Sequence, residues 1–365
     1  MAKILSWQGR IGRPGARPAT VPAFAAFVFV GLLGLTASAA TGGTCGDTTL
    51  SDQGKFCSAT AQALLCACNS AARDDFFVSR AVCANEPEQP DRDECFDDAQ
   101  ATRTEDQDFC VEQHDWRLEA CEVLGEDRYD PPFEGSLFDK DFTKLTKPNP
   151  YYPLGIGYHW EYRSATEVNT VDIQNRTKLI DGVTCIVARD QVFEDGFLKE
   201  ATNDWFAAKK NGDTWYCGEE TGEYEVFNGD KPKLPELVNI DGSFKADRDG
   251  AQPGIIFLAS PVKGDAYFEE FSPANAEDYA IVISTNYSYG KTPALDTNVP
   301  KALAQFLCSA GDCVVTANVS MLEPGVVEHK YYAKGIGTFL ETGPGGEVVR
   351  LVSCNFDARC SSLPK

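Results

Sequence analysis

Residues 183–227 read VTCIVARDQVFEDGFLKEATNDWFAAKKNGDTWYCGEETGEYEVF. β-Branched and aromatic runs in this stretch are separated by Asp195-Gly196 and Asn211-Gly212, and Asn228-Gly229 follows it directly. Asp-Gly and Asn-Gly supply the positive φ angles that a two-residue hairpin turn requires. The stretch therefore predicts a β-meander, around which the longer, carboxyl-terminal part of the chain is organised.

The turns fix the expected register of this meander. With Asp195-Gly196 at the centre of one turn and Asn211-Gly212 at the centre of the next, Cys185 and Cys217 both lie opposite Phe206. Two strand spacings amount to about 9.5 Å, beyond the roughly 7 Å over which a disulfide joins two Cα atoms. A regular sheet therefore predicts that Cys185 and Cys217 are not bonded to each other, although pairing the other cysteines locally would leave these two as partners.

Both faces of the meander are apolar at the centre in this register. One face carries Val183, Cys185, Val187, Phe206, Ala208 and Trp215, and the other carries Ile186, Trp205, Ala207 and Tyr216. An antiparallel sheet with one solvated face alternates more regularly. We therefore expect each face to be covered, by other parts of the chain or by a bound ligand.

Strand patterns continue on both sides of the meander. Tyr158, Trp160 and Tyr162 alternate with polar residues, which is typical of a strand with one aromatic face. Further strands are predicted over residues 254–258, 279–284, 314–319, 326–332, 338–342 and 348–352, and one short helix over 301–307. The sequence predicts an antiparallel β domain over residues 151–365.

Fourteen cysteines divide the chain, because eight of them precede residue 122. In an exported protein this density predicts disulfides. Helical patterns run up to Cys68, over residues 74–82, and from a capping box at Thr102 and Glu105 to a stop at Gly125. We therefore expect an α+β chain of two domains: a small disulfide-rich helical domain (41–127), a proline-rich linker (128–150) and the β domain.

Cysteine spacing suggests the pairing. Cys57 and Cys68 are eleven residues apart, as are Cys110 and Cys121, which returns each pair to one helix face after about three turns. Two antiparallel helices could thus be joined as Cys57–Cys121 and Cys68–Cys110. Local pairs are expected in the β domain: Cys308–Cys313 and Cys354–Cys360.

The first 40 residues predict a cleaved export signal. Four basic residues and no acidic residue precede an apolar run over residues 23–35, and Ala37-Ser38-Ala39 offers a cleavage site. The run is short for a membrane anchor, which is the alternative. We expect a periplasmic or extracellular protein without a membrane span after signal removal, and the net charge of −22 argues against nucleic acid as a partner.

Seven short motifs lie in order along the β domain: Asn149-Pro-Tyr-Tyr-Pro, His159-Trp-Glu-Tyr, Asp181-Gly-Val, Asp204-Trp-Phe-Ala, Asp213-Thr-Trp-Tyr, Pro253-Gly-Ile-Ile and Glu328-His-Lys-Tyr-Tyr-Ala-Lys-Gly-Ile-Gly. Together they resemble a group of exported bacterial proteins without assigned function, over residues 149–340. The last motif is more loosely similar to the final strands of envelope proteins built as curved half-barrel sheets, some of which carry lipids. The likeness implies a curved sheet or half-barrel.

No constellation predicts a catalytic, cofactor or metal site. The chain has three histidines and lacks zinc-protease, nucleophile-elbow and nucleotide-loop motifs. Cys66 with Cys68 could be a redox pair, and Cys110, His114 and Cys121 could bind a metal, but structural disulfides are favoured. Asp241, Asp247 and Asp249 could take calcium, although their spacing is not that of a calcium loop and a solvated loop is favoured.

Three functions remain open. The first is an exported structural or interaction protein of the cell envelope or extracellular space. The second is a binding module for an apolar or aromatic-stacking ligand, with a pocket lined by Trp160, Trp205, Trp215 and Tyr331. The third is a hydrolase using carboxylates, drawn from Glu219, Glu220, Glu269, Glu270 and Glu328, the last beside His329 but expected on the opposite strand face.

Overall fold

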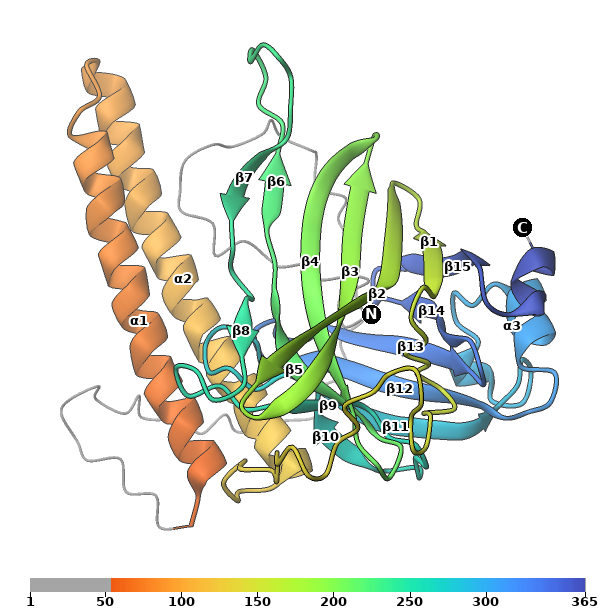
Figure 1. Ribbon diagram of the computed structural model, residues 1–365. Coiled ribbons are helices and arrows are strands. Elements are labelled where there is room, and N and C mark those ends of the chain that lie inside the picture. Colours follow the sequence, from red (N-terminus) through yellow and green to blue (C-terminus); the bar gives the residue numbers. More distant parts are fainter. Residues whose placement is uncertain (1–53, 365) are drawn as a thin grey trace. The chain divides into compact units, whose positions relative to one another are not determined.

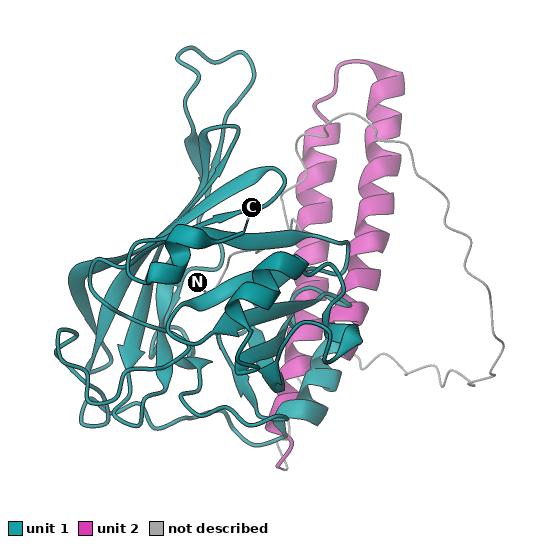
Figure 2. Ribbon diagram, turned by 90° about the vertical axis from the view of Figure 1, so that its right-hand side faces the viewer, with its two compact units in different colours: residues 1–7, 116–365 teal, residues 8–115 magenta. Residues whose placement is uncertain are grey.

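The computed structural model describes residues 54–364, so the predicted signal peptide lies outside the described residues (Figure 1). The helices are α1 (Phe56–Cys83), α2 (Gln89–Leu124), α3 (Lys301–Leu307) and the short 3-10 helices η1 (Pro293–Leu295) and η2 (Ala358–Ser362). The chain divides between Asp115 and Trp116 into two compact units, coloured separately in Figure 2. None of the described helices combines the length and the apolar character needed to cross a membrane.

The unit before Trp116 is a pair of disulfide-bonded helices. Cys68 of α1 is bonded to Cys110 of α2 with 5.7 Å between their Cα atoms, which confirms the pairing predicted from the spacing. A second bridge, Cys83–Cys95, lies where α1 ends and α2 begins. Cys57 and Cys121 are also disulfide-bonded, and their pairing with each other stays a prediction.

Both long helices extend further than the sequence patterns predict. The segment 74–82 is not a separate helix but the continuation of α1, and Thr102 lies inside α2 rather than at its start. Pro90 lies in the first turn of α2, where a missing N–H costs nothing. Because no further breaker follows, the helix runs on to Leu124, where Gly125 (φ 93°) ends it as expected.

The unit from Trp116 onward contains one curved antiparallel sheet of fifteen strands. The strands are β1 (His159–Arg163), β2 (Glu167–Ile180), β3 (Val183–Glu194), β4 (Phe197–Ala208), β5 (Thr214–Glu220), β6 (Glu223–Glu225), β7 (Glu236–Asn239), β8 (Phe244–Lys245), β9 (Gly254–Phe257), β10 (Ala266–Phe268), β11 (Asp278–Tyr287), β12 (Cys313–Ser320), β13 (Val327–Ala333), β14 (Gly337–Thr342) and β15 (Val348–Cys354). Their main order is β10-β11-β12-β13-β14-β15-β1-β2-β3-β4-β5-β8, while β6, β7 and β9 pair at one side. The predicted antiparallel class and curved sheet are confirmed.

The predicted meander is present, but its register differs from the regular one. Asp195 and Gly196 form the turn with positive φ angles of 51° and 80°, as predicted. Within β4, however, Lys199 is an extra residue, because Phe193 lies opposite Leu198 and Val192 opposite Glu200. This β-bulge shifts the pairing by one residue, so that Ile186 and not Cys185 lies opposite Phe206.

A second irregularity explains why the prediction for Cys185 and Cys217 is wrong. Phe206 lies opposite Tyr216 and Trp205 opposite Gly218, which leaves Cys217 as the extra residue of a bulge. Gly218 permits this bulge because its φ is 125° and because a Cβ there would lie 2.2 Å from the carbonyl oxygen of Phe244. Cys185 and Cys217 are consequently bonded, with 6.7 Å between their Cα atoms.

The shift also exchanges the faces expected for β4. We call outer face the side whose core consists of Val183, Cys185, Val187, Trp205, Ala207, Trp215 and Cys217. We call inner face the opposite side, which carries Ile186, Ala188, Phe206, Ala208 and Tyr216. Because a one-residue slip turns every side chain over, Trp205 and Phe206 lie on faces opposite to those predicted.

Both faces are covered by the chain itself, in line with the apolar character of both. On the outer face Phe133 and Phe138, from the predicted linker, pack against Trp215 with ring centroids 6.0 and 5.8 Å away. On the inner face the aromatic rings of Tyr151 and Tyr152 join the larger core. The end of α2 is held to the sheet by a buried ion pair, Arg117 Nε to Glu277 Oε2 at 2.7 Å.

The two β-domain disulfides allow a matched stability test. Cys185–Cys217 closes a loop with a sequence separation of 32, and Cys308–Cys313 one of 5. On chain entropy, Cys185→Ala/Cys217→Ala should lower the free energy of unfolding by about 4 kcal/mol, and Cys308→Ala/Cys313→Ala by about 2 kcal/mol. Urea unfolding of both double variants measures this. If Cys308→Ala/Cys313→Ala lost as much free energy of unfolding as Cys185→Ala/Cys217→Ala, or more, the larger stabilising effect of Cys185–Cys217 would be contradicted.

Candidate functional site

The four aromatic residues predicted to line one pocket are not brought together. Trp160 and Tyr331 belong to the large core, whereas Trp205 and Trp215 belong to the core of the outer face. All four are at most 3% exposed. Trp160 Nε1 donates to the carbonyl oxygen of Ile336 and Tyr331 Oη to that of Leu295, so these polar atoms serve the protein's own packing. The predicted aromatic pocket is therefore not formed by these residues.

A group of ionisable residues lies on the inner face instead. We call it the carboxyl cluster: Asp190 (β3), Asp204 (β4), Glu219 (β5), Glu269 and Glu270 (after β10), Glu328 (β13) and Glu341 (β14), together with Lys330 (β13). Apart from Glu328, which is partly buried, all are at most 5% exposed. Charged side chains are rarely buried to this degree.

Strand register places these residues on one side of the sheet. Asp204 lies opposite Glu219, and Lys330 lies opposite Glu341, and directly opposed residues of antiparallel strands share a face. Burial raises the pKa of Tyr152, and the charges of Asp204 on β4 and of Glu269 beside β10 raise it further. Both ends of the curved sheet therefore lie near this hydroxyl (Figure 1). The cluster is therefore shared by strands far apart in the sheet.

One end of the cluster is centred on Tyr216. Its hydroxyl lies 2.5 Å from Asp204 Oδ1 and 2.8 Å from Glu219 Oε2. A phenol has one proton and can donate to only one acceptor at a time. The Tyr216 hydroxyl therefore donates to one of the two carboxyl groups at a time and holds both beside it.

The other end is centred on Glu269. Its Oε2 accepts from Asn318 Nδ2 at 2.6 Å, and Asn318 Oδ1 in turn accepts from the Thr316 hydroxyl at 2.5 Å. Gly254 allows the backbone of Glu269 to approach β9, because a Cβ there would lie 1.8 Å from the Glu269 carbonyl oxygen. Glu269 is thus fixed in place from its backbone to its carboxyl group.

Burial shifts the protonation of these groups. It raises the pKa of Glu269 to about 7, and burial followed by the charge of Glu341 raises the pKa of Glu328 to about 8. Burial by itself would lower the pKa of Lys330, but the charges of Glu341 and Glu269 raise it above its ordinary value. The Lys330 ammonium, 3.8 Å from Glu341 Oε1, is therefore held charged among carboxyl groups.

Several hydroxyl groups near the cluster have no hydrogen-bond partner among the described residues. They belong to Tyr152 (4% exposed), Tyr267 (7%) and Thr338 (1%). Burial is the largest cause that raises the pKa of both tyrosines; the charge of Asp204 follows for Tyr152 and that of Glu269 for Tyr267, so these hydroxyls lie near the cluster. Buried polar groups are nearly always hydrogen-bonded. The inner face therefore offers hydrogen-bonding groups beyond those that the described residues use.

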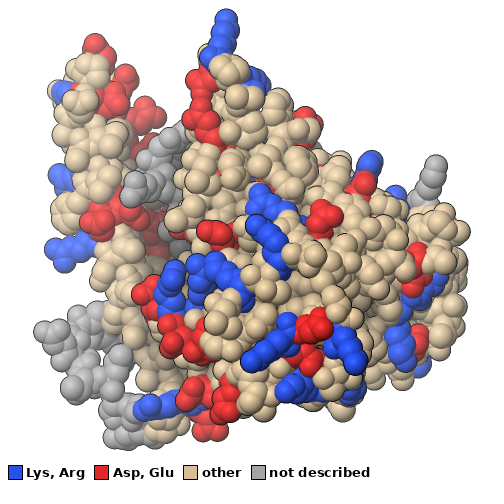
Figure 3. All heavy atoms as spheres, in the orientation of Figure 1, with Lys and Arg blue, Asp and Glu red and all other residues tan. Residues whose placement is uncertain are grey.

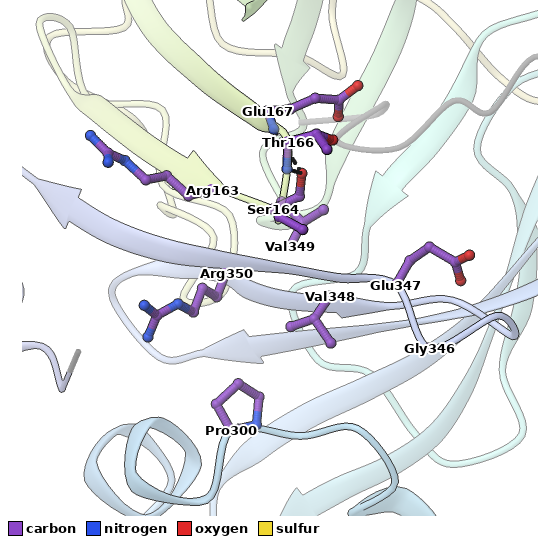
Figure 4. Close-up of a pocket in the computed structure, with 11 residues that line it drawn as sticks. Arg163, Ser164, Thr166, Glu167, Pro300, Gly346, Glu347, Val348, Val349 and Arg350 are labelled. Atoms are coloured by element: carbon purple, nitrogen blue, oxygen red, sulfur yellow. Dashed lines mark hydrogen bonds between the residues drawn. The ribbon is translucent and has the colours of Figure 1, made fainter. Parts of the chain in front are cut away.

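A second candidate is an open cavity of about 670 Å³ at the β1–β2 turn (Figure 4). Arg163 and Arg350 project to the same side, and Glu167 and Glu347 extend to the other. Ser164 accepts hydrogen bonds from the backbone of Thr166 and Glu167 and shapes the turn. The charges of the two basic and the two acidic residues cancel, and the rim of the cavity is exposed. The cavity therefore offers less basis for selecting one ligand than the carboxyl cluster does.

The metal and redox alternatives raised by the sequence gain no support. Cys110 is bonded to Cys68, so neither the Cys66–Cys68 pair nor a thiolate site with His114 exists in this form. Within residues 54–364 no three His, Cys, Asp or Glu side chains are grouped as metal ligands, and this includes Asp241, Asp247 and Asp249, for which calcium was the less favoured alternative.

The sequence predicted some residues of the carboxyl cluster as candidates and not others. Glu219, Glu269 and Glu270 are in it, whereas Glu220 is exposed. Glu328 and His329 lie on opposite faces, as strand alternation requires. The residues missed are Asp190, Asp204, Lys330 and Glu341. The available signal was a charged residue inside an otherwise apolar strand, as in Asp204-Trp-Phe-Ala-Ala and Lys330-Tyr-Tyr-Ala.

Comparisons with known proteins add no assignment, since no family model, curated protein or solved structure matches the chain. The resemblance to exported and half-barrel envelope proteins therefore stays an expectation, and the site rests on its own geometry.

The raised pKa of Glu269 predicts a pH-dependent stability. The folded carboxyl keeps its proton up to pH about 7, whereas the unfolded one releases it near 4.5. Between these values the folded state binds more protons, so the free energy of unfolding falls as pH rises, by up to about 1.4 kcal/mol per pH unit for one group. Glu269→Gln should therefore lose less stability between pH 5 and pH 8 than the unchanged protein.

Urea unfolding at several pH values measures this slope. The exposed Glu236 provides the matched control, since Glu236→Gln should leave the slope unchanged. A Glu269→Gln slope equal to that of the unchanged protein would show that Glu269 is ionised in the folded state throughout this range.

Proposed function

We propose that the protein is an exported binding protein that holds a small, cationic, hydrogen-bonding ligand, such as an amine, on the inner face of the sheet. Disulfides in both units are typical of a compartment outside the cytosol. The periplasm or the extracellular space is the compartment that the predicted export signal favours. Binding here means retention of a ligand rather than its chemical conversion.

The combination of buried carboxyl groups and unpartnered hydroxyls carries this proposal. Glu269 and Glu341 are 4% and 1% exposed. Among the described residues the hydroxyls of Tyr152 and Tyr267 have no hydrogen-bond partner, and the charge of Glu269 contributes, after burial, to raising the pKa of both tyrosines. An ammonium ligand would donate to the carboxylates, while a hydroxyl on the ligand would satisfy the tyrosines. The proposed ligand is polar and so differs from the apolar or aromatic-stacking ligand that the sequence offered as one alternative.

The protonation of the cluster links ligand binding to pH. Glu269 and Glu328, with pKa values of about 7 and about 8, are partly protonated near neutrality. A cation favours their ionised forms, so binding must release protons. Affinity for an amine whose own pKa lies above 9 should consequently rise between pH 6 and pH 8.

A structural or interaction role remains the second candidate, because the helical unit exposes apolar side chains. Phe77, Val78 and Val82 of α1 are 54%, 52% and 58% exposed. Such side chains, close together on one helix, are typical of a surface that contacts another protein. This role concerns the other unit and is compatible with ligand binding by the sheet. No observation among the described residues favours the third hypothesis, a hydrolase using carboxylates, in the same way.

The ligand proposal predicts selective binding of a cation. Calorimetric titration with 1,4-diaminobutane should show saturable binding that strengthens from pH 6 to pH 8, whereas 1-butanol should not bind. Loss of a charge-assisted hydrogen bond corresponds to about a tenfold to hundredfold weaker affinity, expected for Glu269→Gln and Glu341→Gln. Glu236→Gln is the control. Native mass spectrometry of the purified protein would identify a ligand acquired during expression.

Equal binding of the amine by Glu269→Gln, Glu341→Gln and the control would place any bound amine elsewhere on this acidic protein. A clean mass without ligand, together with no response to the diamine at any pH, would remove the proposal and leave the interaction role.

A further inference from the structure

Two lysines converge on one tryptophan of the outer face. Lys178 Nζ lies 3.8 Å from the ring centroid of Trp205, and Lys245 Nζ lies 4.9 Å from the same centroid. Lys178 is on β2 and Lys245 on β8, with β3, β4 and β5 between them in the sheet. The side chains therefore reach the ring from opposite directions, and their stems help to cover an indole that is 2% exposed.

A third cation, Arg248, acts on Lys245, since its charge, after burial and the charge of Lys178, lowers the pKa of Lys245. Arg248 closes the turn after β8, its backbone N–H donating to the carbonyl oxygen of Lys245 at 3.1 Å. Among the residues that the structure describes, no ion pair joins Lys178, Lys245 or Arg248 to a carboxylate. Figure 3 shows basic side chains gathered over the region of β8. A basic group of this kind is unexpected on a chain whose net charge is −22.

Packing on the indole accounts for one lysine but not for two. A single ammonium over a tryptophan ring is a favourable cation–π contact, as Lys209 illustrates 4.4 Å from the Trp215 centroid. A second ammonium at the same ring adds repulsion between like charges. Burial, followed by the charge of Lys178, lowers the pKa of Lys245, and the exposed Glu220 acts in the opposite direction. An anion between the cations would relieve the repulsion.

We propose that Lys178, Lys245 and Arg248 form a binding site for a phosphoryl or sulfate group on the outer face, above Trp205. Lysines contribute point charges and arginine a planar fork, the two kinds of group that proteins use for such anions. The site is independent of the carboxyl cluster, because it uses the opposite face of the sheet. The group could belong to a soluble ester or to a lipid headgroup, which share this chemistry.

Inorganic phosphate and sulfate are the probes, used with the full chain. The indole N–H resonance of Trp205, assigned with Trp205→Phe, should shift saturably with either anion. Lys178→Gln and Lys245→Gln should weaken binding at least tenfold, and Lys178→Arg should restore it. Lys209→Gln is the matched control, because it removes a lysine from a tryptophan of the same face without disturbing the group of three. Thermal unfolding verifies that each variant is folded.

Vesicles separate the two sources. Sedimentation with vesicles containing phosphatidylglycerol, but not with pure phosphatidylcholine, and its loss in Lys178→Gln would assign the site to a lipid headgroup. Saturable phosphate binding without vesicle binding would assign it to a soluble ester. No saturable shift with either anion, or a shift weakened equally by Lys209→Gln, would overturn the proposal and show that the lysines only cover Trp205.

Discussion

Burial of ionisable groups on the inner face is the constraint on which the rest of the structure depends. Moving a carboxylate out of water costs several kcal/mol unless a proton, a cation or hydrogen bonds compensate. Here Glu269 receives an amide N–H from Asn318, and Tyr216 joins Asp204 to Glu219. The raised pKa of Glu269, about 7, shows that such contacts compensate only in part, so the proton itself becomes a component of the site.

The stability that tolerates these buried charges comes from apolar packing, to which the larger inner-face core and the outer face both contribute. The outer face supplies an apolar core containing Trp205, Trp215 and the Cys185–Cys217 disulfide. Aromatic side chains from the segment before β1 cover it, with Phe138 packed edge-on against Trp215. Each fully buried aromatic or aliphatic side chain contributes about 1.5–3 kcal/mol. Apolar cores on both faces of the same strands thus stabilise the fold, while the inner face also carries the ionisable groups.

Local patterns in the sequence predicted much of this fold. The helix over residues 301–307 coincides with α3, and the predicted strands from residue 254 onward coincide with β9 and β11–β15 within a few residues. Residue alternation also placed Trp160 and Tyr162 on one buried face. These features depend on neighbours in sequence, where periodicity and turn residues are informative.

What the sequence did not predict depends on partners distant in the chain. The bulge at Lys199 has no marker of its own, since neither glycine nor proline stands there. The carboxyl cluster gathers residues from β3 to β14, and only the curvature of the folded sheet brings them together. Strong helix formers also joined two predicted helices into α1, because local breaks were weaker than continued helix formation.

The bulge at Lys199 connects the two sides of the sheet. In a regular register, Asp204 and Phe206 would share the face of Cys185, and Trp205 would lie on the opposite face. The one extra residue places Asp204 in the carboxyl cluster and Trp205 beneath Lys178 and Lys245. Side chains of adjacent residues on one strand point to opposite faces. A single inserted residue therefore places an acid on the inner face and an indole on the outer one, and both the carboxyl cluster and the proposed anion site depend on it.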